Sequence, residues 1–191
     1  MTTLYFIRHA QADNSVKNGR IRPLTEKGIA DILLVTDYLQ DKGIDLVFSS
    51  PYKRSIDTLA DFAQKNGHKI ELVEDLRERK SDSDWDREND FIPLIKRQWT
   101  DFFYTLSDGE SLSTVQARNI AALKIILSEN VGKNIVIGTH GTALSTIINY
   151  YDKSYGFPDF AAMSLITPWV VKMEFEGQRC LTIEKIDLFA L

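Results

Sequence analysis

The stretch Leu4-Tyr5-Phe6-Ile7-Arg8-His9-Ala10-Gln11 decides how the chain can fold. Its first four residues are apolar strand formers, and a permanent cation and an imidazole follow them directly. Open α/β sheets bind ligands at the carboxyl ends of their strands. We therefore expect Arg8 and His9 to lie where an anion can be held and attacked, although a solvated strand end would have the same sequence.

The same pattern recurs near the other end of the chain. The apolar run 134–137 ends in Gly138-Thr139-His140-Gly141, and a helix with one apolar face follows. Two of the three histidines, His9 and His140, therefore end apolar strands, whereas His68 lies in a polar turn. His9 and His140 are the candidate site residues of this type.

A third strand-to-helix junction supplies a cation. The apolar strand 44–48 is followed by Ser49-Ser50-Pro51, which predicts a helix with serine as its N-cap and proline in the first turn. Arg54 then lies in that first turn, beside free backbone N–H groups. A cation is unfavourable there unless an anion shares the site, so Arg54 is a candidate anion ligand.

Composition limits the possible functions. The chain has 191 residues, 43% of them hydrophobic and 26% charged, with a net charge of −4. An acidic balance argues against binding to nucleic acid or to an acidic membrane. The single cysteine, Cys180, excludes an internal disulfide. No targeting segment, long apolar run, linker or repeat is present, so we expect one cytoplasmic domain spanning residues 1–191, of unknown oligomeric state.

The remaining periodic segments complete the predicted fold. A helix opens at Pro23-Leu24-Thr25, a short strand covers 70–73, and a helix over 90–106 carries an aromatic stripe interpreted as core. A further helix has capping-box spacing at Ser113 and Gln116. The alternating runs 171–176 and 180–186 predict an antiparallel hairpin. The fold class is therefore α/β, a three-layer sandwich whose mainly parallel sheet has an antiparallel edge. On the first of these helices we expect Ile29, Ile32, Leu33, Thr36 and Leu39 to face inward.

One acidic run has part of the spacing of a metal site. Asp82, Asp84 and Asp86 have the spacing of the first ligands in a calcium loop, but Arg87 stands where glycine is needed and Pro93 where the closing glutamate belongs. The sequence therefore predicts no metal site and no cofactor.

Several of these segments together resemble the motifs of one family. In chain order they are Arg8-His9-Ala10, Pro23-Leu24-Thr25-Glu26-Lys27-Gly28, Ser49-Ser50-Pro51-Tyr52-Lys53-Arg54, Leu76-Arg77-Glu78, Gly109-Glu110-Ser111 and Thr139-His140-Gly141. Their order and spacing resemble the histidine phosphatase superfamily, also called phosphoglycerate mutase-like, over about residues 4–148. The resemblance implies that family's fold and a small phosphorylated substrate.

The resemblance also implies roles for individual residues. His9 would take the phosphoryl group, Arg8, Arg54 and His140 would bind the phosphate, and Glu78 would protonate the leaving group. Beside the pocket, the resemblance points to Asn14, Glu110, Ser111 and Gly141 as substrate-binding residues. Arg77 or Arg79 is a possible ion-pair partner of Glu78.

The chemistry of these residue types agrees with phosphoryl transfer. Two guanidiniums and an imidazole can neutralise phosphate oxygens without a metal, and a neutral imidazole is a competent nucleophile. We expect a metal-independent phosphatase that hydrolyses a phosphoric monoester through a phosphohistidine. The alternatives are a bisphosphoglycerate-dependent phosphoglycerate mutase and a catalytically idle phosphate-binding or interaction module. Mutases of the family have a C-terminal tail over the pocket, whereas this sequence ends at Leu191 after an edge strand, which favours hydrolysis.

Overall fold

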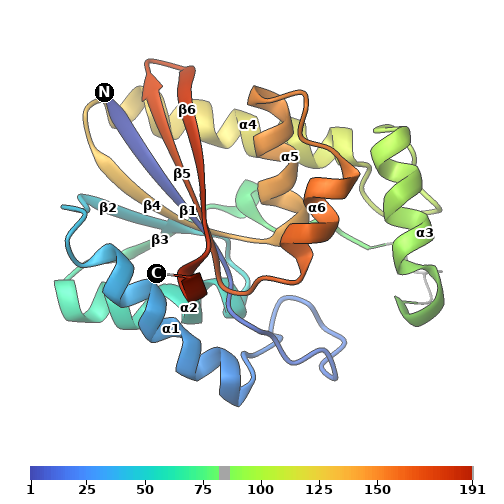
Figure 1. Cartoon of the computed structure of the whole chain (residues 1–191), viewed down its shortest axis with the longest axis horizontal. Helices are drawn as coiled ribbons and strands as arrows, with labels where there is room; N and C mark the ends of the chain where they lie inside the picture. The colour runs from blue at the N-terminus through green and yellow to red at the C-terminus, as the bar shows by residue number, and fades with distance from the viewer. Residues whose placement is uncertain (82–86, 191) are drawn as a thin grey trace.

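The protein, described by a computed structural model, is built on one six-stranded sheet (Figure 1). The structure describes residues 1–81 and 87–190, with the backbone alone over 87–91. The strand order is β3-β2-β4-β1-β5-β6. The strands are β1 (Thr2–Arg8), β2 (Leu46–Ser49), β3 (Ile70–Leu72), β4 (Asn134–Thr139), β5 (Trp169–Glu176) and β6 (Arg179–Ile186).

The direction of the strands matches the sequence-based expectation. Strands β3, β2, β4 and β1 are parallel neighbours, β5 pairs antiparallel with β1, and β6 pairs antiparallel with β5. The predicted hairpin therefore forms the antiparallel edge, and Gly177, with φ +59°, stands in its turn. The fold class predicted from the sequence is confirmed.

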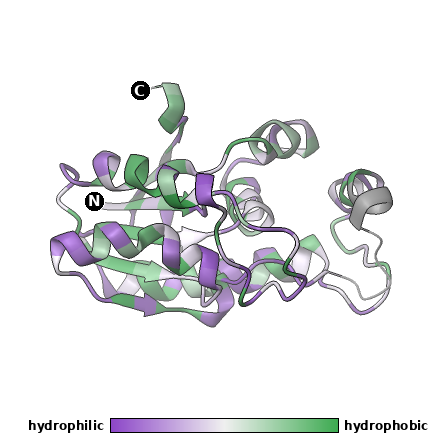
Figure 2. Cartoon of the chain, turned by 90° about the horizontal axis from the view of Figure 1, so that it is seen from below, coloured by the Kyte–Doolittle hydropathy of each residue, from purple (hydrophilic) through white to green (hydrophobic). Residues whose placement is uncertain are grey.

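Helices cover both faces of the sheet, as the alternation of side chains along β1 requires (Figure 1). Leu4 and Phe6 point to a core formed with α4 (Leu112–Glu129), α5 (Gly141–Tyr151) and α6 (Phe157–Ser164). Tyr5 and Ile7 point to a second core formed with α1 (Glu26–Leu39) and α2 (Lys53–Asn66). Figure 2 shows hydrophobic residues along the strands between these helix layers.

The buried face of α1 differs from the predicted one. Ile29 and Leu33 were expected to face inward, but their side chains are 58% and 50% exposed. Thr36 and Leu39 are buried as predicted, and Gly28 and Val35 are buried in place of Ile29 and Leu33. A Cβ on Gly28 would lie 2.2 Å from the carbonyl oxygen of Gln11. The helix therefore seats its glycine against the loop after β1, and this close approach sets its rotation.

Two predicted helix starts are also corrected. Helix α2 begins at Lys53 with Tyr52 as N-cap, two residues later than the Ser50–Pro51 signal suggested. Helix α4 begins at Leu112, and its N-cap is Ser111, whose hydroxyl accepts a hydrogen bond from the N–H of Thr114. The predicted cap, Ser113, already lies inside the first turn. At α4 two serines stand close together, so spacing alone did not select the right one, whereas at α2 the cap is a tyrosine with no side-chain cap hydrogen bond.

The aromatic stripe predicted over 90–106 is core only in part. Helix α3 spans Arg87–Thr100, and within it Leu94 and Ile95 are buried. Trp99 contacts the rings of Tyr155 and Phe160, and α6, which the sequence did not predict, packs against α3. Beyond the helix end, Phe103 is 80% exposed.

The acidic run considered as a calcium loop, residues 82–86, lies outside the described residues. The short 3₁₀ helices η1 (Glu74–Leu76) and η2 (Leu188–Ala190) complete the secondary structure of the described chain.

Candidate active site

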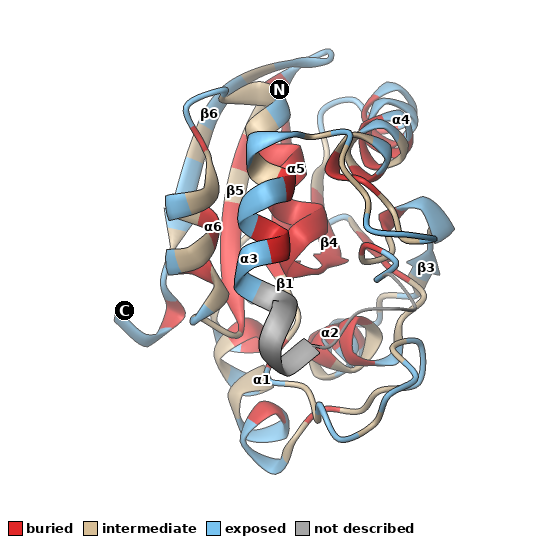
Figure 3. Ribbon diagram, turned by 90° about the vertical axis from the view of Figure 1, so that its right-hand side faces the viewer, coloured by how far each residue is buried: buried red, intermediate tan, exposed pale blue. Residues whose placement is uncertain are grey.

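The two histidines predicted from strand ends meet because β1 and β4 are neighbours. Arg8, the last residue of β1, pairs in register with Thr139, the last residue of β4. The next residues are His9 and His140, whose ring centroids are 5.2 Å apart. The backbone N–H of His9 donates to the carbonyl of Thr139 across 3.1 Å. In Figure 3, β4 and α5 form a buried centre beside β1.

The hydrogen bonds of His9 define its protonation state. Its Nε2 accepts a hydrogen bond from Nε of Arg54 across 3.0 Å, and because a guanidinium can only donate, Nε2 carries the lone pair. Its Nδ1 lies 2.7 Å from the carbonyl oxygen of Ala10 and donates to it. Burial, followed by the charges of Arg54 and Arg8, holds the pKa of His9 well below 6.5. His9 is therefore a neutral imidazole whose Nε2 carries a lone pair and lies beside the guanidinium of Arg54.

Arg54 reaches His9 from the first turn of α2, as predicted. Its side chain is buried, its Nη1 donates to the carbonyl of Gly19 across 2.6 Å, and its guanidinium lies 5.1 Å from the centroid of the Tyr52 ring. These contacts leave the guanidinium little freedom to turn. The loop after β1 thus holds the Arg54 guanidinium in place through the carbonyl of Gly19.

His140 is completely buried at the start of α5. Its Nε2 lies 2.7 Å from Oγ of Ser50, and Oγ in turn accepts a hydrogen bond from the N–H of Tyr52. The pKa of His140 lies well below 6.5, mainly because the ring is buried and also because of the charge of Arg54. Within the described part of the chain, Nδ1 of His140 has no hydrogen-bond partner.

Arg8 joins the site to the end of α6. Its Nη1 donates to the carbonyls of Met163 and Ile166 across 2.6 and 2.7 Å. Its Nε lies beside Gly141, where a Cβ would approach to 3.4 Å, so the glycine leaves room for the guanidinium. Burial lowers the pKa of Arg8 to about 10, which still leaves it cationic at neutral pH. The Nη1 edge of the Arg8 guanidinium is thus fixed by the end of α6, and its Nε edge faces Gly141.

Glu78 lies against the N-terminus of α5. Its Oε2 accepts a hydrogen bond from the N–H of Thr142, and its Oε1 accepts from the N–H groups of Ala143 and Arg79. Thr142 and Ala143 lie two and three residues after His140, so the Glu78 carboxylate lies close to the start of α5, where His140 is the N-cap. Arg77, one of its two possible ion-pair partners, is paired with Glu110 instead.

Three other residues predicted to bind substrate, Glu110, Ser111 and Asn14, make hydrogen bonds or ion pairs with other parts of the protein. Glu110 is paired with Arg77 and Arg118, and burial is outweighed by these hydrogen bonds and charges, so its pKa lies below the ordinary value. Ser111 caps α4. Asn14 is exposed on the loop after β1, where its Oδ1 accepts a hydrogen bond from Arg22.

Sequence reasoning missed two groups that hold the site together. The first is Ser50, which the sequence indicated only as a helix cap and which contacts His140. The second is Arg118, which contacts Glu110 and the backbone around Glu78. Nothing local distinguishes an arginine in the middle of an amphipathic helix, so Arg118 had no signal of its own.

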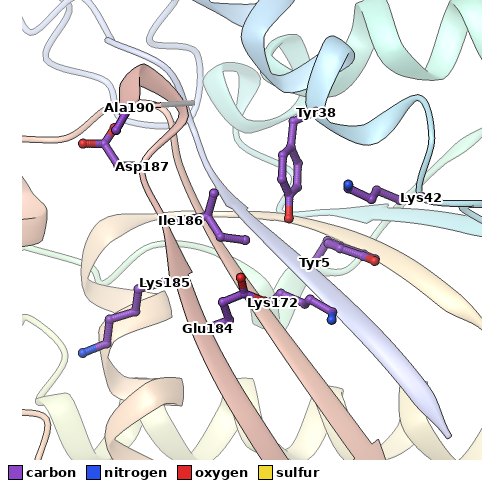
Figure 4. Close-up of a pocket in the computed structure, with 9 residues that line it drawn as sticks. All are labelled: Tyr5, Tyr38, Lys42, Lys172, Glu184, Lys185, Ile186, Asp187 and Ala190. Carbon is purple, nitrogen blue, oxygen red and sulfur yellow. The ribbon is translucent and has the colours of Figure 1, made fainter.

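Other features of the described residues lie away from this site. A cavity of about 550 Å³ opens between α1 and the β5–β6 hairpin, and Figure 4 shows its lining, which includes Tyr5, Tyr38 and Lys172 but none of the candidate site residues. The described residues contain no group of three or more histidine, cysteine or acidic side chains arranged to hold a metal. None of the described helices is both long and apolar enough to span a membrane.

Comparisons with known proteins find chains of similar sequence and structures of similar fold. A probable phosphoglycerate mutase, GpmB, from Yersinia pestis is 26% identical over 159 residues, which cover 78% of this chain and 74% of the relative. Among solved structures, Bacillus stearothermophilus YhfR superposes with a TM-score of 0.80 at 24% identity and covers 95% of each chain. A phosphoserine phosphatase mutant from Entamoeba histolytica, solved with phosphoserine, gives 0.77 at 21% identity over 98% of each chain.

The relatives thus have names of both phosphatases and mutases, and the two structural matches establish a shared fold. The family model of the histidine phosphatase superfamily (branch 1) matches residues 4–185, which is nearly the whole chain. The chain therefore belongs to the histidine phosphatase superfamily.

Proposed function

We propose that this protein hydrolyses a small phosphoric monoester and that His9 carries the phosphoryl group between two half-reactions. The observation that carries the proposal is the pair of hydrogen bonds on His9, with Nδ1–H held by the carbonyl of Ala10 and the Nε2 lone pair beside Arg54. A neutral imidazole held in this tautomer is a nucleophile ready to attack phosphorus. When Nε2 attacks, the Nε–H of Arg54 stops donating its hydrogen bond to Nε2 and donates to a phosphate oxygen instead.

In the first half-reaction, Nε2 of His9 forms a bond to phosphorus and the ester P–O bond breaks. Arg54 and Arg8 offset the charge on the equatorial oxygens, which is the main requirement of phosphoryl transfer, and neutral His140 donates a ring N–H to one of these oxygens. Glu78, whose carboxyl lies against the N-terminus of α5, gives a proton to the departing alkoxide. The product alcohol then leaves.

In the second half-reaction, water gives a proton to the Glu78 carboxylate and attacks phosphorus. The P–N bond breaks, and inorganic phosphate and neutral His9 are released. The cations are all protein side chains, so the reaction we propose needs no metal ion and no cofactor. We further propose that residues 1–191 act as one catalytic domain on a small phosphorylated molecule, without a nucleic-acid or membrane partner.

Within this proposal, Glu110 and Ser111 hold neighbouring segments of the protein in place and do not bind the substrate directly. Glu110 makes two charged contacts and one backbone contact with neighbouring segments, and Ser111 caps α4. Asn14 is proposed to act through Arg22, with which it shares a hydrogen bond at the loop after β1.

The test is to trap the intermediate. Rapid quenching of the enzyme with ³²P-labelled monoester, without acid, is expected to yield an acid-labile, base-stable adduct on His9, and His9→Ala is expected to abolish turnover. Both measurements are repeated in excess chelator, where the activity should persist. An adduct on another residue, turnover by His9→Ala, or activity that depends on added magnesium or manganese would contradict the proposal.

One other reaction is favoured by a specific observation. The relative from Yersinia pestis is named as a probable phosphoglycerate mutase, so transfer between positions of phosphoglycerate is the second candidate. A catalytically idle phosphate-binding module is the non-enzymatic alternative, and the absence of any His9 adduct would favour it.

A further inference from the structure

Arg118 on α4 uses every N–H group of its guanidinium. Its Nε and Nη2 donate to the two carboxylate oxygens of Glu110, each across 2.9 Å. Its Nη1 donates to the carbonyls of Asp75 and Arg77, each across 2.7 Å, and Nη2 also donates to the carbonyl of Glu78 across 3.2 Å. The side chain of Arg118 is only 10% exposed. Such a two-pronged pair of arginine and carboxylate has a fixed orientation.

Glu110 holds the same segment from the other side. Its carboxylate accepts a hydrogen bond from the N–H of Lys80 across 2.8 Å and from Nη2 of Arg77 across 2.9 Å. The N–H of Glu110 also donates to the carbonyl of Lys80. The backbone from Asp75 to Lys80 is thereby held at four of its six residues by one ion pair.

This segment has no regular structure after η1 that could fix it. A connecting segment whose polar backbone groups are not paired in a helix or sheet must be ordered by other partners. Glu78 lies near its centre, and its carboxylate meets the N–H groups of Thr142 and Ala143. The position of that carboxylate therefore depends on two anchors, the N-terminus of α5 and the Arg118–Glu110 pair.

We propose that Arg118 and Glu110 are positioning residues for Glu78, which hold this carboxyl within reach of the leaving-group oxygen. The inference rests on the proposed function, in which Glu78 protonates that oxygen. A general acid must lie within hydrogen-bond distance of the atom it serves, and proton transfer of this kind contributes about 10²- to 10⁴-fold in rate. A loosened segment loses part of that factor while phosphate binding by Arg8, Arg54 and His140 persists.

Two aryl phosphates of nearly equal shape separate positioning from general damage. Phenyl phosphate releases a basic phenolate that needs a proton, whereas 4-nitrophenyl phosphate releases a weakly basic phenolate that does not. The comparison uses kcat/KM, which reports the first half-reaction alone, because the second half-reaction is the same for both substrates. In the variant Arg118→Lys, which keeps the charge but loses the two-pronged guanidinium, we expect kcat/KM for phenyl phosphate to fall by about 10- to 100-fold and kcat/KM for 4-nitrophenyl phosphate by less than about 3-fold. Glu110→Gln should show the same selectivity.

The controls use another arginine–glutamate pair and the acid itself. Arg179→Lys changes an exposed arginine paired with Glu176 on the β5–β6 hairpin and should leave both rates unchanged. Glu78→Gln should reproduce the selective loss at its full size. Melting temperatures of all variants are recorded, and Glu110→Gln, which keeps a hydrogen-bonding side chain, serves if Arg118→Lys does not fold.

Equal losses on both substrates in Arg118→Lys and Glu110→Gln would overturn the inference, because they would indicate a purely structural role. A selective loss in Glu78→Gln without one in the other two variants would overturn it as well and leave the proposed function intact. Failure of the proposed function has a different signature, which is no phosphorylated His9 in the wild-type protein with either substrate.

Discussion

His9 is partly buried and His140 completely buried, both lie without charge near Arg8 and Arg54, and this makes the folded protein sensitive to acid. Both have a pKa well below 6.5 because burial and the neighbouring guanidiniums disfavour the imidazolium form. In the unfolded chain the same groups titrate near a pKa of about 6.5, so below that pH the unfolded state binds more protons. The stability that depends on the neutral rings is present above about pH 6.5 and is lost as the pH falls.

The expected loss is measurable by denaturant unfolding. Between pH 7.5 and 5.5, each histidine should lower the free energy of unfolding by up to about 1.4 kcal/mol. In His140→Gln the fall in the free energy of unfolding over this interval should be smaller than in the wild-type protein by the contribution of one histidine, up to about 1.4 kcal/mol. Identical pH slopes for the two proteins would show that His140 is protonated equally in both states. Glu110, whose pKa is lowered from its ordinary value, contributes at more acidic pH and does not obscure the comparison.

At the scale of elements, the start of α4 brings Glu110 and Ser111 together. Ser111 accepts a hydrogen bond from the N–H of Thr114, and its hydroxyl also lies 3.0 Å from that of Thr114. Because Glu110 immediately precedes the cap, a well-formed helix start places the carboxylate that pairs with Arg118. The cap thus links helix formation to the segment that contains Glu78.

Ser111→Ala is expected to lower the free energy of unfolding by about 1 kcal/mol, the usual cost of losing an N-cap side chain. Ser113→Ala, which removes a hydroxyl from inside the same helical turn, is the matched control and should change stability by less than about 0.5 kcal/mol. Denaturant unfolding measures both, and steady-state kinetics should give an unchanged KM for Ser111→Ala. A raised KM would instead assign the Ser111 hydroxyl to the substrate.

At the scale of the whole molecule, the fold is compatible with both hydrolysis and mutase activity. A mutase must shield its phosphohistidine from water while an intermediate turns round in the site. A cover formed by the segment over 92–106 would need to keep its apolar side chains turned away from solvent. Among its described residues, Ile92, Phe103 and Leu106 are exposed to solvent. Side chains exposed in this way do not exclude water.

We therefore expect phosphate release to exceed exchange between 2- and 3-phosphoglycerate. Both reactions are assayed on one preparation, with and without 2,3-bisphosphoglycerate. Hydrolysis is expected to be at least 10-fold faster, a barrier difference of about 1.4 kcal/mol. Mutase turnover that exceeds hydrolysis by the same factor would reverse the assignment.

The sequence by itself determined the fold class and the identity of the central side chains. Apolar runs that end in Arg8-His9 and His140, together with Arg54 in a first helical turn, are local signals, and the structure brings His9, Arg54 and His140 into contact. Local signals failed where neighbours competed, as at Ser113 and Ser111, or where packing set the rotation of a helix, as at Gly28.

Only the tertiary structure decided how these residues work together. The order of the strands places β4 beside β1 although more than a hundred residues separate them, and this pairing creates the histidine pair. The anchoring of Glu78 by Arg118 likewise joins residues 40 positions apart. The physical reason is that periodicity reports which face of an element is apolar, whereas the partner of a polar side chain depends on which elements pack together.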